Sequence, residues 1–173
     1  MRSCDKDILE QFEFRNIKPD EIDQAIEIEQ ICFPPNEACS PESMRARVEM
    51  APECFLVAVD RQSGRLAGFL NGLATKEGDF RDEFFTDVSL HDSVGDTVML
   101  LGLDVLPEYR RKGLARQIVY QYRERERDRG RKLLCLTCLP DKVEMYKKLG
   151  FTNRGKANSI WGGEEWYEMI CTL

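Results

Sequence analysis

Residues 98–119 of this 173-residue chain read VMLLGLDVLPEYRRKGLARQIV and combine three local signals in one short run. An apolar, strand-like stretch over 98–105 stops at Pro107, a basic turn containing Gly113 follows, and a helical pattern starts directly after it. The first N–H groups of a helix have no partner within it and lie at the positive end of its dipole, where an anion is stabilised. The sequence therefore predicts a strand–turn–helix unit that binds a phosphorylated ligand.

Length and charge narrow the class of protein further. A chain of 173 residues predicts a single domain over 1–173 with a sizeable core. Its net charge of −6 is the reverse of what a nucleic-acid binder carries. Because apolar runs fall short of the roughly 20 residues of a membrane span and the first 14 residues lack a signal-peptide pattern, we expect a cytoplasmic protein with no membrane partner.

The cysteines indicate reduced thiols. Seven of them are scattered along the chain, an odd number that does not suit a disulfide framework. Cys135 and Cys138 have the C-x-x-C spacing, but they lie in a strand-like run, where positions three apart point to opposite faces. With His91 as the single histidine, we expect no metal site.

Hydrophobic periodicity predicts alternating elements of a mixed α/β sheet. Asp20 is the expected N-cap of a first helix, and Ser40 followed by Pro41 is the expected start of a second. The charged run 123–129 is expected to be a solvated helix face. Strands are predicted over 12–17, 54–59, 66–73, 97–105, 133–139, 151–159 and 165–171, and helices over 20–31, 41–50, 82–85, 113–129 and 141–149.

Two landmarks in this order resemble the GNAT superfamily of N-acetyltransferases. Arg110, Gly113 and Ala115 have the Arg-x-x-Gly-x-Ala spacing of its acetyl-CoA loop, and residues 146–151 have the Tyr-x-x-x-Gly-Phe pattern that closes the cofactor site. The resemblance implies an α/β (α+β) GNAT fold: a central mixed, mostly antiparallel sheet of about seven strands flanked by about four helices. It also implies acetyl-CoA as cosubstrate and no metal.

A closer resemblance, over about 28–173, is to the arylalkylamine (serotonin) N-acetyltransferase family. It is carried by 29–41, 54–59, 90–91, the cofactor loop and 166–169. It implies that amides of the bulged strand hold the pantetheine arm and thioester carbonyl, that amides of the loop hold the pyrophosphate, and that Tyr146 lies near the sulfur. The implied cofactor-binding residues are Leu103, Asp104, Val105, Arg110, Arg111, Lys112, Gly113, Leu114, Ala115 and Arg116, and the implied amine slot is lined by Phe33, Pro41 and Trp166.

One departure concerns the base that deprotonates the amine. Vertebrate members of the family carry two histidines where this chain has Met99 and Leu101. Glu37, between two expected walls of the slot, is a candidate to bind the ammonium and accept its proton, or else is an exposed loop residue. Asp104 interrupts an apolar strand and either acts as a base or orders the loop by pairing with an arginine. His91 lies in a polar turn and is expected at the surface.

Acyl transfer from a thioester also requires a proton for the departing thiolate, and the Tyr146 phenol is suited to donate it. We therefore predict an acetyl-CoA-dependent N-acetyltransferase of small primary amines, of arylalkylamine or polyamine type, with Tyr146 and Glu37 as catalytic residues. Direct attack in a ternary complex is preferred to a route through an acetylated Cys138. The enzyme is expected to be a monomer or homodimer. The alternatives are a protein N-terminal or lysine acetyltransferase and a non-catalytic acyl-CoA-binding module.

Overall fold

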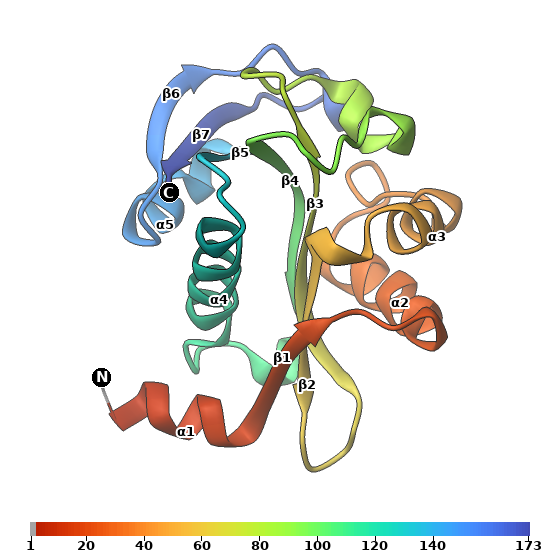
Figure 1. The fold of residues 1–173 in the computed structure, drawn as a ribbon, viewed down its shortest axis with the longest axis vertical. Coiled ribbons are helices and arrows are strands. Elements are labelled where there is room, and N and C mark those ends of the chain that lie inside the picture. Colours follow the sequence, from red (N-terminus) through yellow and green to blue (C-terminus); the bar gives the residue numbers. More distant parts are fainter. Residues whose placement is uncertain (1–2) are drawn as a thin grey trace.

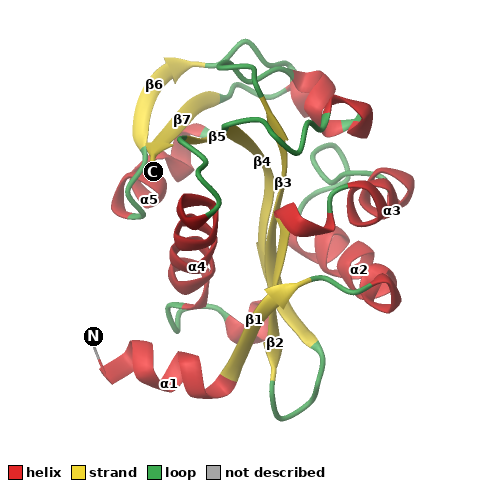
Figure 2. Cartoon of the chain, viewed as in Figure 1, coloured by secondary structure: helices red, strands yellow, loops and turns green. Residues whose placement is uncertain are grey.

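A seven-stranded sheet organises the computed structural model, which describes residues 3–173 (Figures 1 and 2). Its spatial order is β1-β2-β3-β4-β5-β7-β6, and neighbouring strands are antiparallel except β4 and β5. This confirms the mixed, mostly antiparallel sheet expected from the sequence. The strands are β1 (Phe12–Asn16), β2 (Phe55–Asp60), β3 (Leu66–Thr75), β4 (Thr97–Val105), β5 (Leu133–Cys138), β6 (Thr152–Lys156) and β7 (Tyr167–Thr172).

Helices cover both faces of the sheet. In Figure 1, α2 and α3 lie on one side, while α1, α4 and α5 lie on the other. Each side buries its own hydrophobic cluster, the first including Ile28 and Val48 and the second including Leu114 and Ile118. The five helices of the described chain are α1 (Ser3–Gln11), α2 (Ile22–Cys32), α3 (Pro41–Met50), α4 (Leu114–Asp128) and α5 (Val143–Lys148).

The helix starts differ from expectation at two places. Helix α1 was not predicted, because its apolar residues do not form a periodic stripe; Ile8 alone is buried on it. Asp20 is not the N-cap of α2: residues 19–21 form a 3-10 turn and the helix begins at Ile22. The prediction for α3 is confirmed, since the Ser40 hydroxyl accepts the Ser43 N–H at 3.1 Å and Pro41 is the first helical residue.

The parallel pair β4–β5 splits soon after it forms. The two strands pair only over 97–99 and 133–135, and beyond that they have no register with each other. On its other side β4 has a bulge: Asn71 lies opposite Gly102 and Gly72 opposite Leu100, so Leu101 is an extra residue. The sheet therefore opens between β4 and β5 next to the bulge.

The cysteines behave as expected. All seven are free thiols. Cys135 packs in the cluster with Met99, while Cys138 packs in the cluster with Ile118, so the two sulfur atoms lie on opposite faces of β5. The C-x-x-C spacing therefore joins neither a disulfide nor a shared ligand set.

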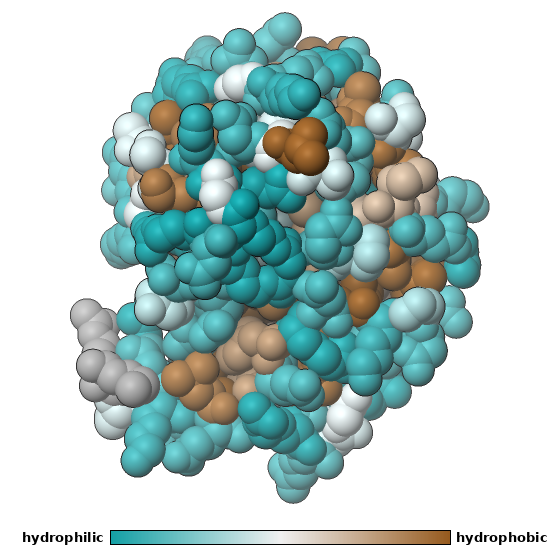
Figure 3. Space-filling model, viewed as in Figure 1, coloured by the Kyte–Doolittle hydropathy of each residue, from teal (hydrophilic) through white to brown (hydrophobic). Residues whose placement is uncertain are grey.

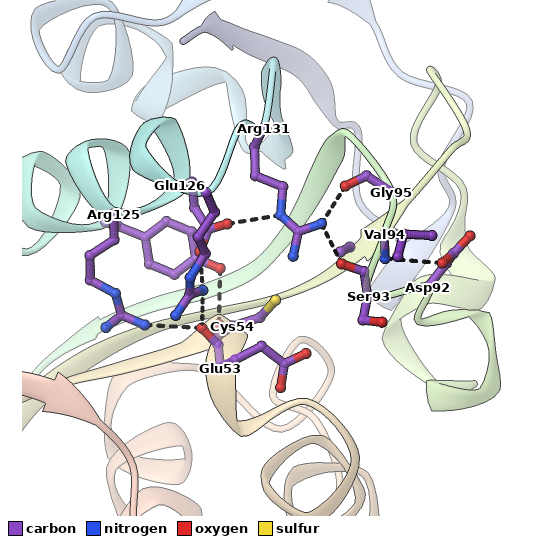
Figure 4. A network of polar contacts seen from close by, with 12 residues as sticks. Glu53, Cys54, Asp92, Ser93, Val94, Gly95, Arg125, Glu126 and Arg131 are labelled. Carbon is purple, nitrogen blue, oxygen red and sulfur yellow. Dashed lines mark hydrogen bonds and ion pairs between the residues drawn. The ribbon is translucent and has the colours of Figure 1, made fainter.

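A buried ionic network anchors the C-terminal part of α4, which corrects the expectation that 123–129 is only a solvated face (Figure 4). Glu126 is fully buried; its carboxylate accepts from Arg131 Nε at 3.1 Å and from Arg129 at 2.7 Å. Arg131 also donates to the Ser93 carbonyl at 2.8 Å, and Arg125 donates to the Glu53 carbonyl at 3.0 Å. These contacts fix α4 against the start of β2 and the loop before β4.

The surface in Figure 3 is mostly hydrophilic, with hydrophobic side chains in small, separate patches. Among residues 3–173 the structure contains no helix with the length and apolar character needed to cross a bilayer.

The network generates a stability prediction. Glu126→Ala leaves the Arg131 guanidinium buried without its counter-charge, and we expect a loss of about 3 kcal/mol in the free energy of unfolding, measured by urea denaturation. The matched control is Glu124→Ala, which removes the exposed ion pair with Arg127 and is expected to change that free energy by less than about 1 kcal/mol. Equal losses in the two variants would contradict this account.

Candidate active site

A pocket lies where the sheet opens. It measures about 540 Å³ out to its open mouth and reaches from the bulge of β4 to the loop before β7. Most of its walls are apolar, and two carboxyl side chains, one phenol and one hydroxyl also line it. Its lining residues are Glu29, Phe33, Glu37, Leu70, Phe85, Leu100, Leu101, Gly102, Leu103, Leu136, Thr137, Tyr146, Trp161 and Trp166.

The basic turn leads into α4 with the geometry that an anion site requires. Gly113 is the N-cap in the left-handed region (φ 88°), and Arg111 also has a positive φ of 62°. The first hydrogen bond of the helix runs from Gln117 N to the Gly113 carbonyl at 3.1 Å. The preceding N–H groups therefore point out of the helix end, and they fit the phosphates of a coenzyme.

Two of the loop's arginines are already engaged within the chain. Arg110 Nε donates to the Val105 carbonyl at 2.8 Å, which ties the loop to the end of β4. Arg116 contacts Asp5 of the unpredicted helix α1. Arg111 and Lys112 are exposed. Leu114, the first residue of α4, is buried in the hydrophobic cluster beneath that helix, and Ala115 is half-buried against the same cluster.

The segment of β4 before the loop contributes to the pocket unevenly. Leu103 and the bulge residue Leu101 both line the pocket. Leu101 stands at one of the two positions where vertebrate arylalkylamine N-acetyltransferases have histidine. Met99, at the other position, is fully buried in the core. Asp104 is also fully buried and forms no pair with an arginine, which corrects the expectation that it orders the loop in this way.

Tyr146 is half-buried on α5, and its ring edge packs against Phe151 with 5.7 Å between centroids. Burial raises the pKa of the Tyr146 phenol above its ordinary value, and Cys138 and Asp104 add to the increase. The phenol therefore remains protonated at neutral pH, as a proton donor must.

Aromatic rings form the opposite wall. Of the three residues expected to line an amine slot, Phe33 and Trp166 line this pocket, whereas Pro41 is exposed at the first turn of α3. Sequence reasoning left Phe85 out of the slot, although its ring lines the pocket and stacks on Trp161 with 4.6 Å between the ring centroids. Phe85 follows a polar segment and carries no local signal of a binding role.

Two loops from distant parts of the sequence join at this wall. The Trp161 indole donates to the Glu37 carbonyl at 2.9 Å, and the Asn36 side chain donates to the Gly162 carbonyl at 3.0 Å. A β-carbon on Gly162 would lie 2.5 Å from the Asn36 carbonyl oxygen, so the loops touch at backbone level. The loop after α2 and the loop before β7 thus form one continuous rim.

Glu37 is half-buried in this rim and lines the pocket. Burial raises the pKa of its carboxyl, and the nearby Glu164 and Asp141 add to the increase. A second carboxyl, Glu29, also lines the pocket and was missed by sequence reasoning. The signal was present: Glu29 falls on the helical stripe of Ile22 and Ala25, where an acidic side chain must be buried.

His91 is not at the surface, contrary to expectation. Its Nδ1 accepts the Ala74 N–H at 3.0 Å and its Nε2 lies 2.6 Å from Glu53 Oε1, outside the pocket. Together with Cys54 these groups could converge on a metal ion. A ring whose Nδ1 already accepts an N–H carries its own proton on Nε2 and donates it to Glu53, so Nε2 has no lone pair for a metal.

Comparison with solved structures shows the same fold at low sequence identity. The GNAT-like decarboxylase GphF, in complex with isobutyryl-CoA, superposes with a TM-score of 0.79 at 17% identity, covering 92% of this chain and 98% of that one. The ribosomal-protein-S18-alanine N-acetyltransferase of Escherichia coli gives 0.69 at 17% identity, covering 94% of each chain. The spermidine N-acetyltransferase SpeG of Vibrio cholerae gives 0.66 at 13% identity, covering 94% of each.

No curated protein matches the chain by sequence. Residues 22–151 do match the acetyltransferase (GNAT) family, a span that runs from the start of α2 through the basic turn before α4 and Tyr146 to Phe151. The split between β4 and β5 and the left-handed Gly113 at the head of α4 lie within that span, as do all the lining residues of the pocket except Trp161 and Trp166. The chain belongs to the GNAT family of acetyltransferases.

Proposed function

We propose that this acyltransferase moves the acetyl group of acetyl-CoA to a small primary amine by direct attack in a ternary complex. The amides of 111–116 and the exposed Arg111 and Lys112 are suited to the coenzyme's phosphates. Leu103 and Val105 continue the same edge of β4 toward the pocket, where their amides are suited to the pantetheine arm and the thioester carbonyl. No metal enters the proposed reaction.

The observation that carries the small-amine proposal is the joined rim. Because the loop after α2 and the loop before β7 are hydrogen-bonded to each other, the rim favours a walled acceptor pocket over an open groove for a polypeptide. Its rings suit an apolar or aromatic amine, and Glu37 adds a carboxylate for the ammonium. An arylalkylamine fits this lining best.

The chemistry requires two groups of the chain. After the ammonium has lost one proton, the amine nitrogen attacks the thioester carbonyl, a C–N bond forms, the C–S bond breaks, and the nitrogen's second proton passes to solvent. Tyr146 gives its proton to the departing thiolate and regains one from solvent. Glu37 holds the ammonium at the mouth of the pocket.

A thiol-release assay with acetyl-CoA tests the acceptor class. We expect turnover with tryptamine and phenylethylamine, weaker turnover with spermidine and none with a short peptide bearing a free N-terminus and lysine. Turnover of the peptide alone would contradict the small-amine proposal. Acetyl-CoA binding without turnover of any acceptor would instead favour a non-catalytic module.

Two neighbouring glycines of the loop before β7 test whether the contact between the two loops of the rim is needed for amine binding. Gly162→Ala places a β-carbon against the Asn36 carbonyl and should part the two loops, raising KM for the amine about tenfold or more, the effect of losing about 1.4 kcal/mol of binding. Gly163→Ala is the control, since its backbone is equally left-handed (φ 73°) but nothing lies within 4 Å of the added carbon. An equal rise of KM in both would show that backbone strain, not the joined rim, is responsible.

Tyr146→Phe removes the proton donor without changing the ring. We expect kcat to fall about 100-fold, the usual size of a general-acid contribution. Since burial raises the pKa of Tyr146, the wild-type rate should show no falling limb from this group below about pH 10. Tyr120→Phe, on the exposed face of α4, is the control. An unchanged rate and pH profile in Tyr146→Phe would remove this residue from the reaction.

Glu37→Gln tests the ammonium contact. Loss of one charge-assisted contact at the mouth should raise KM for the amine about tenfold with little change in kcat. A fall in kcat at constant KM would show instead that Glu37 takes part in the chemical step.

A further inference from the structure

Three carboxyl oxygens of Glu29 and Asp104, beside the pocket, have no hydrogen-bond donor among the described residues. Asp104 on β4 is fully buried, and neither of its carboxyl oxygens has a partner among the described residues. Glu29 on α2 is 4% exposed, and its Oε1 also lacks a donor, while its Oε2 accepts the Cys39 N–H at 3.0 Å. A buried carboxylate with no donor is unfavourable, so these oxygens require an explanation.

The unpartnered oxygens converge on one point above the bulge. A β-carbon built on Gly102 would lie 3.1 Å from Asp104 Oδ1 and 3.4 Å from Glu29 Oε1. The Asn71 amide nitrogen lies 3.3 Å from the same point, but it donates to the Gly102 carbonyl. Glycine at this position leaves room for the two carboxyl groups to meet.

The charges around Glu29 and Asp104 favour a state in which one of the two carboxyl groups is protonated. The buried cation nearby, Arg47 of α3, donates to the Asn71 side chain at 3.2 Å and to the Phe85 carbonyl at 2.9 Å. One cation balances one carboxylate, and two ionised carboxylates in a single buried site repel each other. Burial raises the pKa of Asp104 well above its usual range, and the adjoining Glu29, then Cys32 and Cys39, raise it further.

We propose that Glu29 and Asp104 share one proton, carried by Asp104 and donated to Glu29 Oε1, and that Glu29 held in this way accepts the proton of the amine. Glu29 lines the pocket together with Gly102 and Tyr146, so it can act directly or through one water. Asp104 lies behind it and is a positioning residue. The proposal rests on the proposed function and supplies the base that Met99 and Leu101 cannot provide.

The proton balance is complete. The ammonium loses one proton to Glu29, after which the pair holds two protons and the nitrogen is free to attack. The nitrogen's second proton passes to solvent as the C–S bond breaks, and solvent restores to Tyr146 the proton that it gives to the thiolate. The pair then returns its extra proton to solvent.

The shared proton has a readout that does not depend on activity. The folded protein holds the Asp104 proton to higher pH than the unfolded chain, where an aspartate titrates near about 3.9. The stabilisation is therefore complete below that pH and is lost as pH rises toward the folded-state value. The side chains that face Asp104 from α2 and the loop after it are Glu29, Cys32 and Cys39, and each of them raises its pKa. From α5 it is faced by Tyr146, whose phenol is neutral.

Asp104→Asn keeps the shape and a donor toward Glu29 but has no proton to lose. The quantity to measure at each pH is the ratio of folded to unfolded protein, in the wild type and in Asp104→Asn. We expect the wild-type ratio, relative to that of the variant, to fall by up to about tenfold per pH unit from about pH 5 upward. The infrared spectrum of the wild type should also carry a protonated-carboxyl band at neutral pH that is lost in the variant. A ratio that is constant with pH, or a wild type without that band, would overturn the shared proton.

The acceptor role is tested by kinetics. Glu29→Gln should lower kcat/KM at pH 7 by about 100-fold, and its residual rate should rise about tenfold per pH unit as free amine accumulates. Glu27→Gln, exposed on the same helix, is the control and should match the wild type. A Glu29→Gln profile parallel to that of the wild type would overturn the acceptor role. Failure of the proposed function itself would appear as a wild type without amine turnover, whatever the stability data show.

Discussion

The early separation of β4 from β5 is the constraint on which the rest of the molecule depends. Parallel strands need a long crossover between them, here α4, and these two strands pair only over 97–99 and 133–135. Beyond that point the edge of β4 faces a gap. The bulge at Leu101 turns β4 at the same place, and the helix N-terminus with its unpaired amides opens beside it. One departure from regular pairing thus places the open N-terminus of α4 and the pocket next to each other.

Buried charge supports this arrangement on both faces of the sheet. Glu126 and Arg131 hold the far end of α4, which fixes the direction in which its N-terminus points (Figure 4). On the other face, the carboxyl groups of Glu29 and Asp104 meet beneath the pocket near Arg47. The two sets differ in chemistry. The first is fully paired and is structural, whereas the second has oxygens without donors, which is typical of groups that take up and release protons.

Local signals predicted most of the fold. The span of β4 and the cap of α3 follow from periodicity and capping chemistry, and both are confirmed. Helix α1 was missed because its order comes from packing Ile8 near Gly113 and pairing Asp5 with Arg116, contacts between residues more than 100 positions apart.

Contacts between distant residues also explain which residues of the site could not be predicted from the sequence. Tyr146, Phe33 and Trp166 carried motif or composition signals, while Phe85 reaches the pocket only through tertiary packing. His91 was expected at the surface because it lies in a polar turn. Its ring is instead held by a hydrogen bond to Glu53, a residue 38 positions away.

In the proposed reaction, one pocket, open on the coenzyme side and walled on the acceptor side, brings a thioester and a small amine together at the same time. Initial rates of amide formation, measured while acetyl-CoA and tryptamine are varied against each other, test it most directly. A ternary complex predicts double-reciprocal lines that intersect. Parallel lines would indicate an acetylated enzyme intermediate and would contradict the account.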